Sequence, residues 1–154
     1  MQQFMDGSPD GGTPLCAHIN AIIKDVEAIE AQLRAANQKV CVVIATDGES
    51  SDGDISAVMR PLKNLPVIIV MRLCTNEERI VNYWNSIDQE LELSMDVLDD
   101  ICGEAEEIHK VNKWLTYAEP IHRMREFGIS LKEFDLLDEK ALHMEQMVKV
   151  CKTM

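Results

Sequence analysis

Asp47 is the residue of this chain best placed to do chemistry. It follows the apolar run Val40–Thr46 and begins the polar segment 47–53, which reads DGESSDG. A carboxylate at the end of a buried strand lies over the edge of a sheet, where a hard divalent cation such as Mg²⁺ can find the oxygen ligands it prefers. Thr13, which follows two glycines and precedes Pro14, offers a hydroxyl that either caps a helix or turns toward a metal.

Other chemistries of the Asp47 loop each lack a required residue. An EF-hand loop would need glycine where Asp52 stands. A phosphotransferase of the haloacid dehalogenase type would need a nucleophilic aspartate two residues before Asp47, and Ala45 occupies that place. The sequence has no GxxxxGK[ST] phosphate loop, and none of its four histidines pairs with a cysteine or carboxylate at a recognised spacing.

The elements that position these residues alternate between helix and strand. Apolar residues recur at steps of three and four from Leu15 to Leu33, which predicts a long amphipathic helix that Thr13 could cap. Apolar runs at 40–46 and 66–73 predict strands buried on both faces, and a weaker strand is expected over 93–97. This alternation predicts an α/β fold, a Rossmann-like three-layer sandwich of about three parallel strands flanked by helices.

The rest of the chain is predicted to be helical. Trp114, Tyr117 and Phe127 are expected to be core residues. An apolar stripe near the C-terminus is expected to pack in the core or on another helix, and it consists of Ala141, Met144, Met147, Val148 and Cys151. We therefore divide the chain into an N-terminal loop over 1–10, a domain over 11–128 and a C-terminal helical extension over 129–154.

Composition narrows the classes of partner. The formal net charge is −12, which disfavours nucleic acid and anionic membrane surfaces as ligands. The segment 80–109 holds nine acidic residues and no Lys or Arg, so it is either a solvated face or a surface for a basic partner. Five cysteines without CxxC spacing favour neither a disulfide framework nor a zinc site. Residues 1–6 resemble no secretory signal, and we expect a cytoplasmic location.

Two segments of the chain resemble metal-site segments of von Willebrand factor A (vWA) domains. They are Gly12-Thr13-Pro14-Leu15 and, after the long helix, 42–48, which reads VVIATDG. In that family a DxSxS segment, a Thr and an Asp form the metal ion-dependent adhesion site, and Thr13 and Asp47 match the Thr and the Asp. No DxSxS segment follows a strand here, since 6–10 imitates only part of it. The resemblance covers residues 11–125 and implies the C-terminal half of such a domain, without its first three strands.

The function implied by this resemblance is a non-enzymatic protein-interaction module with an incomplete metal site. Thr13 and Asp47 would hold Mg²⁺ weakly, with Mn²⁺ or Ca²⁺ as alternatives, and the protein partner would be met through a carboxylate or a basic surface. Without the first three strands, the strand 40–46 would be an exposed edge that could also mediate self-association. The alternatives are a metal-assisted hydrolase or ATPase accessory that uses Asp47, and a vestigial or fragment domain with a purely structural role.

Overall fold

The computed structural model describes residues 12–91, 93–129 and 131–154. The predicted loop over 1–10, including the partial DxSxS match at 6–10, lies outside the described residues. No helix in the described part of the chain is long and apolar enough to cross a membrane.

A three-stranded parallel sheet forms the centre of the molecule. Its strands are β1 (Val40–Thr46), β2 (Val67–Leu73) and β3 (Met95–Leu98), and they lie in sequence order. Val40 is paired with Val67, and Ile69 with Met95. The predicted parallel order is confirmed, and the expected strands match within one or two residues at each end.

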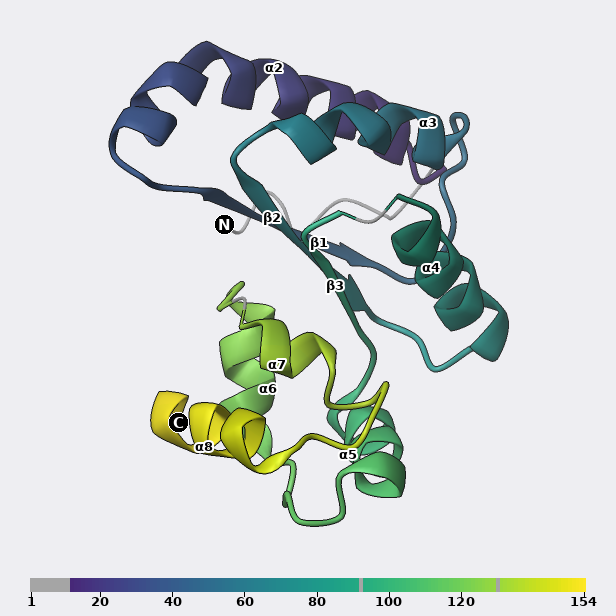
Figure 1. The fold of residues 1–154 in the computed structure, drawn as a ribbon. Coiled ribbons are helices and arrows are strands. Elements are labelled where there is room, and N and C mark those ends of the chain that lie inside the picture. Colours follow the sequence, from purple (N-terminus) through teal and green to yellow (C-terminus); the bar gives the residue numbers. More distant parts are fainter. Residues whose placement is uncertain (1–11, 92, 130) are drawn as a thin grey trace, which may run out of the picture.

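Helices flank the sheet, as in a Rossmann-like layout (Figure 1). α2 (Leu15–Ala35), α3 (Ile55–Met59) with the 3-10 turn η1 (Arg60–Asn64), and α4 (Glu78–Leu91) pack on what we call the first face. α5 (Ile101–Val111), α6 (Glu119–Glu126), α7 (Lys132–Asp135) and α8 (Met144–Thr153) form the other half of the molecule. α6 contacts the second face of the sheet at β2.

The first face holds the larger hydrophobic core. Ile69 and Met71 of β2, both buried, pack there with Trp84 of α4 and Ile19 of α2. Alternation along each strand therefore points one set of side chains into this core and the other set to the second face.

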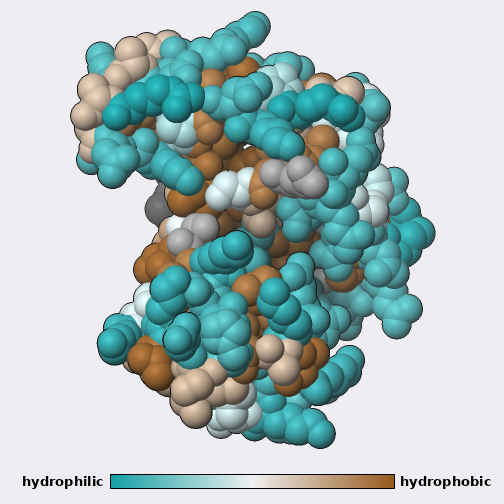
Figure 2. Space-filling view, in the orientation of Figure 1, coloured by the Kyte–Doolittle hydropathy of each residue, from teal (hydrophilic) through white to brown (hydrophobic). Residues whose placement is uncertain are grey.

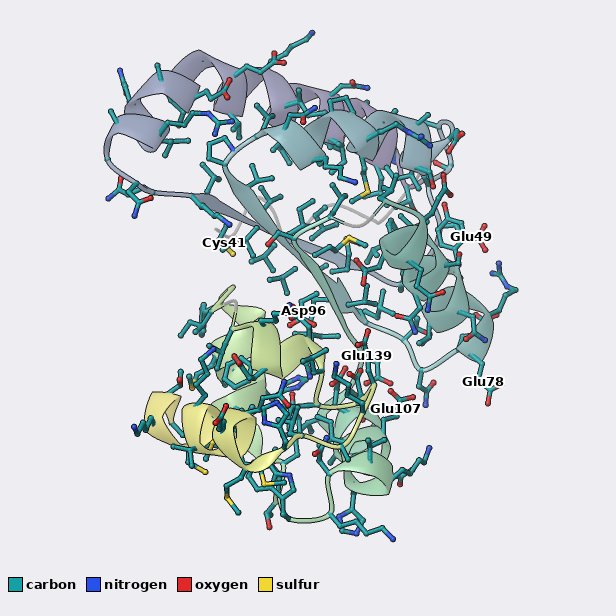
Figure 3. All side chains as sticks on the ribbon, viewed as in Figure 1. Cys41, Glu49, Glu78, Asp96, Glu107 and Glu139 are labelled. Carbon is teal, nitrogen blue, oxygen red and sulfur yellow. The ribbon has the colours of Figure 1, made fainter. Side chains whose placement is uncertain are left out.

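The strand β1 differs from its prediction. Burial on both faces was expected, but Cys41, Val43 and Ala45 are exposed on the second face, with Val43 at 53%. The reason is that α6 covers β2 and leaves β1 open. Figure 3 shows Cys41 on the side of β1 away from α2.

A second hydrophobic cluster joins α5 to α8. Ile108, Ile121, Phe134 and Leu137 are buried in it. Asn112, at the end of α5, fixes the later chain, since its amide donates to Leu137 O and Lys140 O and accepts from the Leu142 N–H at 2.8 Å.

Two predictions about the helical half are wrong in part. Tyr117 is buried as expected, but Trp114 is partly exposed and Phe127 is 75% exposed, because Phe127 lies beyond the end of α6. In the C-terminal stripe, Met147 packs against the second hydrophobic cluster as expected, but Met144, Val148 and Cys151 are exposed and Ala141 precedes α8. The buried residue of the helix is Val150, so the packed face is turned from the predicted one.

Gly128 explains how the chain leaves α6. Its φ is +72°, and the Ile129 N–H donates to Met124 O at 3.0 Å, which is the geometry of a left-handed helix end that favours glycine. A Cβ at Gly128 would also collide with the Cys41 thiol of β1. Glycine at this position lets the chain after α6 approach the second face of β1.

Candidate functional site

The loop that follows β1 is fixed by neighbours on both sides. Thr46 is buried, and its hydroxyl lies 3.3 Å from the Gly48 N–H, which forms a tight turn. The buried Trp84 indole of α4 donates to Gly48 O at 3.2 Å, and Arg79 pairs with Glu49. The loop is therefore ordered at the carboxyl end of β1, where ligands of parallel sheets bind.

Asp52 in this loop caps the N-terminus of α2. Its two carboxylate oxygens accept from the Cys16 N–H at 2.9 Å and the Ala17 N–H at 2.8 Å, and from the Ser50 hydroxyl. The helix has no cap from its own segment, so the prediction that Thr13 caps it is wrong. Sequence reasoning missed this cap because the donor and the acceptor lie 35 and 36 residues apart.

The pKa of Asp52 reflects these contacts. Partial desolvation acts to raise it, but the hydrogen bonds from Ala17, Cys16 and Ser50 outweigh that effect and lower it from 3.8 to about 2. The carboxylate is therefore ionised at any ordinary pH, which suits the positive end of a helix dipole.

Thr13 and Asp47 reach the same end of the sheet. The carbonyl of Thr13 accepts from the Ser51 N–H at 2.9 Å, so Thr13 abuts the loop that Asp47 begins. Asp47 is exposed, and its carboxylate has no hydrogen-bond or ion-pair partner within the described ranges. No group of three or more His, Cys, Asp or Glu side chains that could hold a metal ion was found among the described residues. The matched pair offers one hydroxyl and one carboxylate.

A second polar site lies on the second face, around a buried arginine. Arg125 of α6 is 2% exposed and binds Asp96 of β3 through two hydrogen bonds of 2.8 and 3.1 Å. It also donates to Glu104 of α5 and to the Tyr117 hydroxyl at 3.2 Å. Next to it, Glu126 pairs with Arg72 of β2. One arginine thus joins the sheet to two helices.

Charge balance in this cluster leaves one carboxylate in excess. Glu104 is 3% exposed, and burial raises its pKa to about 7 even though Arg125 acts to lower it. Burial also raises the pKa of Tyr117 to about 12. His122 contacts the Tyr117 hydroxyl, and burial together with Arg72, Arg125 and Arg123 lowers its pKa, so it stays neutral at pH 7.

An acidic cavity of about 180 Å³ opens beside Arg125. Figure 3 shows Asp96 and Glu139 at the junction of the sheet and the helical half. Burial and neighbouring carboxylates raise the pKa of Asp88 and of Asp135 to about 6. The carboxylates that line the cavity are Asp88, Asp96, Asp135, Asp138 and Glu139. This arrangement favours a cationic group over an anionic one.

Part of this acidic site could be predicted from the amino-acid sequence. The acidic segment 80–109 includes Asp88 and Asp96, and it was predicted as a solvated face or a surface for a basic partner. No sequence pattern marks Arg125, Asp135 and Asp138 as members of this site, because only the fold brings α6 and the α7 region to β3. No family model, curated protein or solved structure was found to match the chain.

Replacement of Asp52 by Asn tests the cap on α2. We expect a melting temperature lower by a few degrees at pH 7, because the backbone N–H groups of Cys16 and Ala17 lose a charged acceptor. A carboxyl with a lowered pKa stabilises the fold above its unfolded value of 3.8, and this contribution disappears as the pH falls to about 2. The melting temperatures of the parent and of Asp52→Asn should therefore converge as the pH falls from about 4 to about 2. Asp25→Asn, which removes a charge from the exposed face of α2, should leave the melting temperature unchanged.

Replacement of Arg125 by Met tests the buried cluster. We expect a loss of about 3–5 kcal/mol in the free energy of unfolding, because the buried carboxylate of Glu104 and the partly buried carboxylate of Asp96 lose their counter-ion. Arg123→Met, on the exposed side of the same helix, should cost less than about 1 kcal/mol. Urea titrations followed by circular dichroism measure both values.

Replacement of Glu104 by Gln tests the excess charge. Because its folded pKa lies above its unfolded value, the native state holds the extra proton, and stability falls as the pH rises from about 4.5 to about 7. The Gln variant should lose this part of the pH dependence and unfold at higher urea than the parent at pH 8. A steeper decline in the variant would contradict the assignment.

Proposed function

We propose that this chain is a non-enzymatic protein-interaction module that binds a partner through the open edge of β1. The proposal includes the vWA-like assignment, with the chain as the C-terminal half of such a domain. The observation that carries the proposal is that β1 lies at an edge of the sheet and exposes its second face.

The backbone of β1 is suited to take another strand. The Val40 N–H donates to Pro66 O at 2.9 Å, and Thr46 O accepts from the Cys74 N–H at 2.8 Å. Every second residue from Val40 to Thr46 therefore points its backbone N–H and C=O groups toward β2. Cys41, Val43 and Ala45 point theirs away from the sheet. An extended peptide can pair with such groups and add a strand.

The side chains around this edge are apolar. Val43 is joined by Phe127 and Ile129, both exposed beside the Gly128 approach to β1. Figure 2 shows hydrophobic surface at the level of the sheet, between the two helical layers. Charged residues and Pro usually keep a free edge strand from pairing, and β1 contains none of them and no Gly.

A metal at Thr13 and Asp47 is the second part of the proposal. Mg²⁺ wants six oxygens and usually relies on one or two carboxylates plus water, so two protein ligands support only weak binding. In this arrangement the cation would meet a partner carboxylate beside the β1 edge, and the rest of the loop would keep its structural contacts.

Selection of displayed peptides against the chain tests the edge. We expect enriched peptides to have a short run of β-branched residues. Val43→Pro should weaken a selected peptide about tenfold or more, because it removes one outward N–H and leaves the β1–β2 hydrogen bonds intact. Val43→Ala shortens the same side chain but keeps the N–H, and should weaken binding much less. Peptides that bind Val43→Pro as well as the parent would contradict the proposal.

Calorimetric titration of Mg²⁺ tests the metal. We expect a dissociation constant on the order of 1 mM, which corresponds to about 4 kcal/mol, and its loss in Asp47→Ala. Asp25→Ala makes the same charge change on α2 and should bind Mg²⁺ like the parent. Equal binding by the parent and Asp47→Ala would remove Asp47 from the site.

A further inference from the structure

We propose that two copies of this chain pair through β1, antiparallel and about a two-fold axis at Val43, so that their sheets join into one. This inference rests on the proposed function and names the partner that the edge takes. The supporting observation is that β1 and an antiparallel second copy of β1 are complementary in backbone hydrogen bonding and in charge.

The backbone parity of β1 fits this pairing. With Val43 opposite the Val43 of the second copy, Cys41 lies opposite Ala45. All three have backbone groups that point away from β2, so each opposed pair can exchange two hydrogen bonds. Their side chains are small, uncharged and exposed, and they meet on the same face.

Charge fixes the register. The same alignment places Lys39, just before β1, opposite Asp47, just after it, so that in the paired form the lysine of the second copy takes the place of a metal ion at Asp47. Both side chains are exposed, and neither has a partner within the described part of the chain. A shift of two residues separates Lys39 from Asp47: in one direction Lys39 faces Ala45, and in the other it faces Glu49, which Arg79 already pairs. Opposite charges that face each other across two strands stabilise a pair, which favours the register with Lys39 opposite Asp47.

The wider charge distribution favours the antiparallel arrangement. Arg34 and Lys39 lie at the amino end of β1, and Asp47, Glu49 and Asp54 lie at its carboxyl end. An antiparallel pair brings unlike ends together, whereas a parallel pair of copies would bring like ends together. Because each chain carries a net charge of −12, only the arrangement with local attraction is expected to persist.

Sedimentation equilibrium of the full chain tests the dimer and its register. We expect a monomer–dimer equilibrium with a dissociation constant in the micromolar range, roughly as for other small interfaces. Lys39→Asp and Asp47→Lys should each weaken dimerisation about tenfold, and the double variant should restore it. Glu145→Lys and Lys152→Asp make matched charge changes on α8 and should have no effect.

Cysteine cross-linking gives an independent readout. In a background with Ser at Cys74, Cys102 and Cys151, Ala45→Cys should form a disulfide dimer through the Cys41 that faces it, since opposed Cα atoms are about 5.5 Å apart. The same substitution should form none when Cys41 is also Ser. Val43→Cys should cross-link to its own copy without Cys41.

The outcomes separate this inference from the proposed function. One outcome is a chain that is monomeric at about 0.5 mM, far above the expected micromolar dissociation constant, and still binds strand-forming peptides. That result overturns the self-pairing and leaves the proposed binding of a partner at the β1 edge standing. A dimer that the double charge variant fails to restore, or that cross-links through Ala45→Cys without Cys41, overturns the register. A chain that binds neither itself nor any strand peptide overturns both proposals.

Discussion

The buried arginine Arg125 is the contact on which the arrangement of the two halves depends. It is the cation shared by Asp96 of β3, which is partly buried, and Glu104 of α5, and both Arg125 and Glu104 lie where water cannot solvate an unpaired charge. The alternation of β3 places Asp96 on the second face, opposite the core side chains Met95 and Val97. The helical half therefore docks on the second face of the sheet, where Arg125 can neutralise the Asp96 carboxylate.

This anchoring explains the open surface of the molecule. The ion pairs that tie α6 to the sheet are those of Arg125 with Asp96 of β3 and of Glu126 with Arg72 of β2. β1 stands on the far side of β2, so α6 does not reach over it. The chain after α6 comes back toward Cys41 only at Gly128, and it leaves Phe127 and Val43 in solvent. The same ion pairs that build the second layer thus leave β1, within the described part of the chain, uncovered on its second face and paired along one edge only.

Local pattern was enough to predict the strands and their parallel order, but not the contacts between distant segments. The apolar run Val40–Thr46 and the position of Asp47 after it follow from composition alone, because apolar β-branched residues favour buried strands. The cap of α2 by Asp52 and the partners of Arg125 depend on residues brought together by the fold. The exposure of Val43 could not be read from its strand either, since it depends on where α6 is tied.

The edge strand and the net charge act against each other, and their balance sets how far association can go. Pairing through β1 uses the same edge of both copies, so it closes after two chains. The other edge of the sheet is β3, which has four residues and carries Asp96, with Asp99 and Asp100 directly after it. Short length and charge both oppose pairing at an edge. A chain with an apolar free strand can therefore form a closed pair and still resist growth into a longer sheet.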